Sequence, residues 1–148
     1  MKAICLAAVG VTFFRCEPEP VDERPERVVA EFVERMQRVH GDPESARAAY
    51  DLLWGEGKAN LAERAKRASA LSDRKVGPEE MLAPSHFSLA FTPRRWTARI
   101  DGQWAVVTVA GEAEQQREIR CVAEDGRWRI VQPFPPLTPI RKRPDSAE

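Results

Sequence analysis

The sequence predicts an α+β fold in which N-terminal helices pack on a curved antiparallel sheet of four or more strands. Up to residue 82 the apolar residues recur at intervals of three and four, which is the period of a helix face. After Pro93 they alternate with polar residues, as in a strand, and two Asp-Gly pairs interrupt the alternation. With 148 residues, 43% of them hydrophobic, the chain is long enough for one domain of this kind.

The N-terminal segment has the pattern of a secretory signal. Lys2 precedes an uncharged, mostly apolar run from Ala3 to Phe14. As a helix this run spans about 18 Å, which is too short for a hydrocarbon core of about 30 Å and suits a signal peptide. Cys16 follows the run, at the place where a bacterial lipoprotein carries its lipidated cysteine, although Arg15 replaces a small residue.

We therefore expect a signal-like segment at 1–15, a Pro/Glu-rich tether at 16–25, and lipidation of Cys16 as an anchor on the periplasmic side of an envelope membrane. Two alternatives remain open. The apolar run could be a buried strand or helix of a cytoplasmic domain, and an exported chain without lipid could pair Cys16 with Cys121 in a disulfide.

The first two helices are delimited by proline and glycine. The first begins at Pro25, and Gly41 ends it. Asp42 and Pro43 then supply an N-cap and a first-turn proline for the second helix, which is expected to run to Trp54.

Gly55 and Gly57 are expected to separate the second helix from a third one, over 61–71. A short helical turn over 78–82 completes the helical half. Residues 85–91 are expected to form either a short strand or an irregular crossing to the sheet.

The two hairpins predict a four-stranded meander and its registers. In the first hairpin Asp101 and Gly102 are the expected turn residues. The residues expected to lie opposite each other on the two strands are then Ile100 and Gln103, Ala98 and Ala105, and Trp96 and Val107. In the second, with Asp125 and Gly126 as turn residues, they are Glu124 with Arg127, Ala123 with Trp128, and Cys121 with Ile130.

The alternation then assigns residues to two faces. The predicted core face comprises Trp96, Ala98, Ile100, Ala105, Val107, Val109, Ile119, Cys121, Ala123, Trp128 and Ile130. The predicted solvated face comprises Arg95, Arg99, Trp104, Thr108, Glu118, Arg120, Arg127 and Arg129. On that face the register places Arg99 opposite Trp104, where the two are expected to stack.

Composition excludes several classes of function. The chain has 23 basic and 23 acidic residues, so it lacks the positive field of a nucleic-acid-binding protein. Its two histidines and three cysteines do not have zinc-ligand spacing, and no phosphate-binding loop, HExxH or GxSxG motif occurs. We therefore expect no metal, no cofactor and no nucleic-acid partner.

Over residues 26–134 the chain resembles a nuclear transport factor 2-like domain, in the version found in small bacterial envelope lipoproteins. The resemblance rests on Gly41, Asp42, Ala46, Ala49, Tyr50, Leu52 and Leu53, and on a closing strand at 125–131. It implies a cone-shaped α+β roll, with a Pro/basic tail at 135–148. Enzymes of that superfamily place Asp, His or Tyr inside the cone, and many other members only bind or assemble. No Asp-containing catalytic pattern matches the core-facing positions here, so no catalytic residue is assigned.

The expected cavity lining is aromatic, and it comprises Tyr50, Trp54, His86, Phe87 and Trp96. His86 is expected near the mouth of the cone, and Tyr50 is expected to carry its hydroxyl at the rim. Cys121, on the core face, is expected to be an inert buried thiol.

These residues favour a non-enzymatic, envelope-tethered domain that binds a small apolar ligand or a protein partner. Two alternatives are a small-molecule isomerase, lyase or hydrolase that uses the cone, and a cytosolic accessory subunit that forms a homodimer.

Overall fold

The computed structural model describes residues 23–139, so the signal-like segment, Cys16 and the end of the tail lie outside the described residues. Three helices, α1 (Pro25–Arg38), α2 (Pro43–Asp51) and α3 (Gly55–Leu71), come first. Two 3-10 turns follow, η1 (Pro78–Met81) and η2 (Pro84–His86). No helix of the described part is long and apolar enough to cross a membrane.

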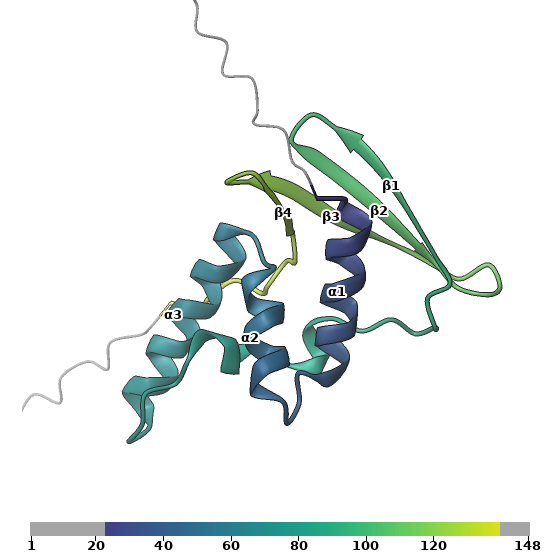
Figure 1. Cartoon of the computed structure of the whole chain (residues 1–148). Helices are drawn as coiled ribbons and strands as arrows, with labels where there is room; N and C mark the ends of the chain where they lie inside the picture. Colours follow the sequence, from purple (N-terminus) through teal and green to yellow (C-terminus); the bar gives the residue numbers. More distant parts are fainter. Residues whose placement is uncertain (1–22, 140–148) are drawn as a thin grey trace, which may run out of the picture.

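A single antiparallel sheet follows the helices (Figure 1). Its strands are β1 (Arg95–Asp101), β2 (Trp104–Ala110), β3 (Gln116–Glu124) and β4 (Arg127–Ile130), in the spatial order β1-β2-β3-β4. The α+β class and the four-stranded meander are therefore confirmed.

The amphipathic pattern of α1 supplies the helical side of the core. Its buried face includes Val28, Phe32 and Met36, and Phe32 packs edge-on against Phe87 with ring centroids 5.2 Å apart. At the start of α2 one carboxylate oxygen of Asp42 accepts the Ser45 N–H at 3.3 Å, so the predicted N-cap is confirmed.

The boundary between α2 and α3 differs from the prediction. Gly55 and Gly57 do not separate the helices but lie in the first turn of α3, and α2 already ends at Asp51. Leu53 pairs with Ile130 in a parallel bridge, and the Trp54 N–H donates to the Ile130 carbonyl at 3.1 Å. The segment between the helices therefore lies along β4, because its backbone groups find partners there.

A close contact explains the glycine at position 57, and a long-range hydrogen bond caps the start of α3. A Cβ atom at Gly57 would lie 2.8 Å from the Trp54 ring, which is closer than packed atoms approach. The Gly55 N–H donates to the Glu124 side chain at 2.9 Å, so a carboxylate of β3 caps α3. Local sequence does not reveal the contact with Glu124, which is 69 residues away from Gly55.

The register of the first hairpin was predicted wrongly, whereas that of the second is confirmed. Asp101 pairs with Trp104 and Ile100 with Ala105, so the turn residues are Gly102 and Gln103. Gly102 has φ +56°, and positive φ at the first turn residue alone is typical of a type II′ turn. The shift of two residues keeps every side chain on its predicted face.

The predicted core face is buried over β2, β3 and β4, except for Ala123, which is half-buried. Its fully enclosed members include Ala105, Val107, Val109, Ile119, Cys121, Trp128 and Ile130. On β1, however, Ile100 is 56% exposed and Trp96 and Ala98 are only half-buried. β1 lies at one edge of the sheet, and the cover provided by the helices does not extend over its whole length (Figure 1).

On the solvated face, the predicted stack of Arg99 on Trp104 is not formed. Arg99 pairs with Val106 because of the register shift, and the guanidinium over the Trp104 ring is that of Arg120, 5.4 Å from its centroid. Trp104 lies opposite Val122 on the neighbouring strand, so Arg120 approaches it diagonally.

The segment after β4 lies against α3 without regular secondary structure. Arg64 donates to the Pro135 carbonyl at 2.6 Å, and Arg67 donates to the Thr138 carbonyl at 2.7 Å. These two side chains, one helical turn apart, hold the proline-rich segment extended across the helix, as its prolines predict.

Candidate functional site

The five residues predicted to line a cavity come from α2, from the segments after α2 and at η2, and from β1. Phe87 is in the core, 5% exposed, whereas Tyr50 on α2 and Trp96 on β1 are half-buried. Trp54 and His86 each line a separate hollow, and none of the hollows described below contains two of the five. The assignment of these residues to a ligand therefore stays a prediction.

His86 lies in η2, and both its ring and its backbone are held in place. Its Nδ1 accepts the Ala83 N–H at 3.1 Å, and its carbonyl accepts the Gln132 side chain at 2.9 Å. The ring meets Phe134 edge-on, with centroids 5.3 Å apart. Because Nδ1 is an acceptor, the proton of the neutral ring resides on Nε2, and neither nitrogen is then available as a general base.

A hollow of about 520 Å³ lies beside His86, between α3 and the C-terminal segment. Arg64 and Arg67 line it, together with residues 135–138. Burial lowers the pKa of His86 below its ordinary value, and the positive charge of Arg64 lowers this pKa further.

We predict that the neutral form of His86 stabilises the fold. Between the lowered pKa of the folded state and the ordinary value of 6.5, the unfolded chain binds a proton that the folded chain does not. The free energy of unfolding should therefore decrease as the pH falls below about 6.5, and this contribution should level off below the folded-state pKa. Urea unfolding of wild type and His86→Asn at about pH 7.5 and about pH 5.5 measures the contribution of His86 to this pH dependence. Asparagine is the substitute because its side-chain oxygen can accept the same N–H and does not titrate.

Arg64→Met serves as a control for the cause of this shift. Removing the guanidinium should raise the pKa of His86, which an NMR titration of the ring protons reports directly. If His86→Asn shows the same loss of stability with falling pH as wild type, the prediction is wrong.

Trp54 lines a smaller hollow of about 180 Å³, together with Gly57, Asn60, Gln132 and Phe134. The indole Nε1 is buried, and no hydrogen-bond acceptor among residues 23–139 reaches it. The indole ring packs closely against the backbone of Gly57.

Two other reactive side chains are unsuited to act as nucleophiles at neutral pH. Cys121 is completely buried, and burial raises the pKa of its thiol to about 12, so the thiolate that would attack a substrate does not form at neutral pH. Burial also raises the pKa of Tyr50, assisted by the negative charges of Asp51 and Glu79, so its hydroxyl stays protonated. Within residues 23–139, no three His, Cys, Asp or Glu side chains lie close enough together to hold a metal ion.

A third hollow is one that sequence reasoning missed. It has a volume of about 590 Å³ and lies where the turn between α1 and α2 meets η1. Its apolar floor includes the buried side chains of Val39, Ala46 and Leu82. Its rim carries four carboxylates, from Asp42, Glu44, Glu79 and Glu80, and one guanidinium, from Arg47. We call this hollow the acidic groove.

Hydrogen bonds keep two of these carboxylates ionised. The Ser45 hydroxyl donates to Asp42 at 2.7 Å and lowers the pKa of that carboxyl. Arg74, 2.8 Å from Glu80, lowers the pKa of the Glu80 carboxyl in the same way. Arg47 lies 3.5 Å from Glu79 and is the one guanidinium of the rim. Because four carboxylates line the rim, its net charge is negative.

The acidic groove joins segments that are far apart in the sequence. Asp42 and Glu44 open α2, whereas Glu79 and Glu80 lie in η1. A surplus of acidic residues in the helical half was the only local signal, and it does not indicate which carboxylates meet. No protein-family model, no curated protein and no solved structure matches this chain.

Proposed function

We propose that this chain is a non-enzymatic binding domain, tethered at the cell envelope by its N-terminal segment, that receives a basic segment of a partner protein in the acidic groove. The observation that carries the proposal is that four carboxylates line a groove that also has apolar residues in its lining. The order of helices followed by a meander supports the further proposal that the domain is nuclear transport factor 2-like.

The shape and charge of the groove favour a polypeptide over a small apolar ligand. The groove is open to solvent, and an extended chain can place alternate side chains on its floor and toward its rim. Lysine or arginine side chains would neutralise the surplus of carboxylates, while apolar side chains cover Val39 and Leu82. A small apolar ligand would need an enclosed aromatic cavity, whereas Trp54, His86 and Phe87 each line a different hollow.

The state of the reactive side chains favours binding over catalysis. The Cys121 thiol is buried with a raised pKa, and the Nδ1 atom of His86 already accepts the Ala83 N–H. The carboxylates of Asp42 and Glu80 have lowered pKa values, whereas a general acid needs a raised one. The groove therefore offers charge and apolar surface for recognition.

A peptide of alternating lysine and leucine residues, labelled with a fluorophore, is the probe for this proposal. We expect it to bind the full chain and to shift the NMR signals of residues that line the groove. A double variant, Glu44→Gln with Glu79→Gln, should weaken binding about fivefold, because it removes two rim charges that are each worth about 0.5 kcal/mol. Raising the salt concentration should weaken binding by screening the same charges.

The matched control is Glu112→Gln with Glu114→Gln, which makes the same change of charge in the loop between β2 and β3. This control should bind the peptide as wild type does. If both double variants weaken binding equally, or if the peptide with glutamate in place of lysine binds as tightly, the groove is not a site for basic segments.

A further inference from the structure

β1 presents an unpaired backbone edge. It is the outermost strand of the sheet in Figure 1, and its only strand partner among residues 23–139 is β2. In an antiparallel ladder the backbone groups of successive residues point alternately toward and away from the partner strand. Because Asp101 and Trp104 flank the two-residue turn, the N–H and C=O groups of Trp96, Ala98 and Ile100 point away from β2. Such an edge is a template for another strand.

The side chains of β1 complement a second copy of the same strand. If two β1 strands pair antiparallel around a twofold axis at Ala98, Arg95 lies opposite the partner's Asp101, and Trp96 lies opposite the partner's Ile100. Each of these pairs occurs twice, because the interface is symmetric. Thr97 lies opposite the partner's Arg99, so no like charges meet. Opposite charges and apolar pairs at such positions stabilise a strand pair.

Charge also excludes the neighbouring registers. A shift of two residues in one direction places Arg95 opposite the partner's Arg99, and a shift in the other direction places Arg99 opposite the partner's Arg99. Like charges directly opposite each other are destabilising. The register centred on Ala98 is the one that pairs all seven residues of β1 and brings no like charges together.

The exposure of the core face along β1 fits the same partner. Ile100 is 56% exposed and Trp96 is half-buried, although both lie on the face that the helices cover elsewhere. In the paired strand each Ile100 would pack beside the partner's Trp96, and apolar surface that α1 leaves uncovered would be removed from water.

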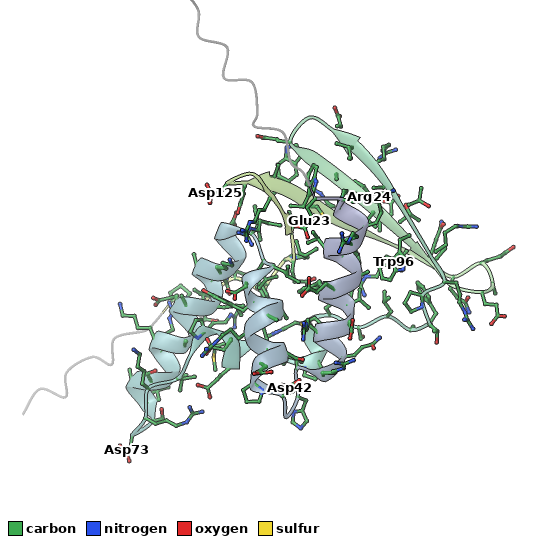
Figure 2. The ribbon with its side chains drawn as sticks, viewed as in Figure 1. Glu23, Arg24, Asp42, Asp73, Trp96 and Asp125 are labelled. Carbon is green, nitrogen blue, oxygen red and sulfur yellow. The ribbon has the colours of Figure 1, made fainter. Side chains whose placement is uncertain are left out.

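We propose that two copies of this chain associate through β1, as an antiparallel edge-to-edge pair that joins their sheets into one continuous sheet of eight strands. One strand pair buries less surface than a standard protein–protein interface, so the dissociation constant should be micromolar. Asp42, in the acidic groove, and Trp96, on β1, lie in different parts of the molecule (Figure 2), so the dimer leaves the groove accessible.

A charge swap in the full chain tests the register. Arg95→Asp and Asp101→Arg each convert two attractive pairs into repulsive ones, so analytical ultracentrifugation should show the dissociation constant rising at least about tenfold. The double variant, Arg95→Asp with Asp101→Arg, restores opposite charges and should return the constant to within about threefold of wild type. A merely structural defect would not be rescued, and circular dichroism of each variant checks the fold.

Disulfide crosslinking tests the twofold axis. With Cys5 and Cys16 replaced by serine, Ala98→Cys should form a covalent dimer when copper–phenanthroline is added, because Cα atoms of a hydrogen-bonded pair lie about 5.5 Å apart. Thr97→Cys is the matched control, since its partner's Thr97 is displaced along the strand beyond disulfide reach. Cys121 is buried and stays reduced in both.

Any of the following results would overturn the proposal. The first is a wild-type chain that sediments as a monomer up to its solubility limit. The second is a charge swap that leaves the double variant as weak as the single ones, or equal crosslinking at positions 97 and 98. The third is protection of the Trp96, Ala98 and Ile100 amides from hydrogen exchange at every concentration, because the chain itself would then cover the edge.

Discussion

Replacing Trp128 with alanine is expected to lower the free energy of unfolding by about 3–5 kcal/mol, a large part of the stability of a domain of this size. Trp128 is 4% exposed, lies opposite Ala123 and belongs to the core between sheet and helices. The decrease in the free energy of unfolding has two sources. The variant no longer buries a large aromatic surface, and a cavity remains where the side chain was, because the sheet around it is rigid. Urea unfolding followed by far-ultraviolet circular dichroism measures it.

Trp104→Ala is the matched control for this prediction. Trp104 is on the opposite face of the sheet, is 38% exposed and contacts Arg120. Its replacement should cost less than about 1 kcal/mol, since it loses partial burial and one exposed cation–π contact. Equal losses of stability for the two variants would refute the assignment of Trp128 to the core side.

Replacing Cys16 with serine is expected to move the chain from the membrane fraction to a soluble fraction in bacteria that express its full length. The proposed anchor consists of acyl chains on Cys16, and each buried methylene group contributes about 0.8 kcal/mol. One acyl chain binds a membrane only marginally, so stable retention requires the several chains of a bacterial lipoprotein. Without the thiol none can be attached, and incorporation of radiolabelled palmitate should be lost.

Cys5→Ser provides the control, because Cys5 lies within the apolar run that processing before Cys16 would remove. This variant should keep both the palmitate label and the membrane location. Cys121 cannot replace Cys16 as an acceptor, since it is completely buried. Recovery of the intact, unprocessed wild-type chain in the cytosol would contradict both the anchor and the envelope location.

The features that were predicted correctly from the sequence depend on local sterics and on periodicity. The buried face of α1 follows from its apolar spacing, and the Asp42 cap follows from the side chains that can satisfy a first-turn N–H. The register of the second hairpin follows from Asp125 and Gly126, which both adopt positive φ. In each case the residues that determine the structure are within a few positions of one another.

The tertiary structure alone decided the features in which distant segments meet. A two-residue shift of the first hairpin leaves the hydrophobic pattern unchanged, so the pattern could not show that Gly102 begins the turn. The start of α3 depends on Ile130 and Glu124, whose backbone and side-chain oxygens accept N–H groups from Trp54 and Gly55. Local propensity contains no information about partners that are so far apart in the sequence. The backbone adopts a conformation in which its N–H groups find acceptors.

The same reason separates what could be foreseen of the functional surfaces from what could not. The sequence alone identifies Cys16 at the end of an apolar run and the alternation that aligns Arg95, Trp96, Ile100 and Asp101 along one strand. Only the packing of η1 against α2 assembles the acidic groove, and only the limited reach of the helices leaves Ile100 exposed at the sheet edge. The residue spacing within one helix or strand determines which of its side chains lie on the same face. Which side chains of two different elements meet depends on how the whole core packs those elements together.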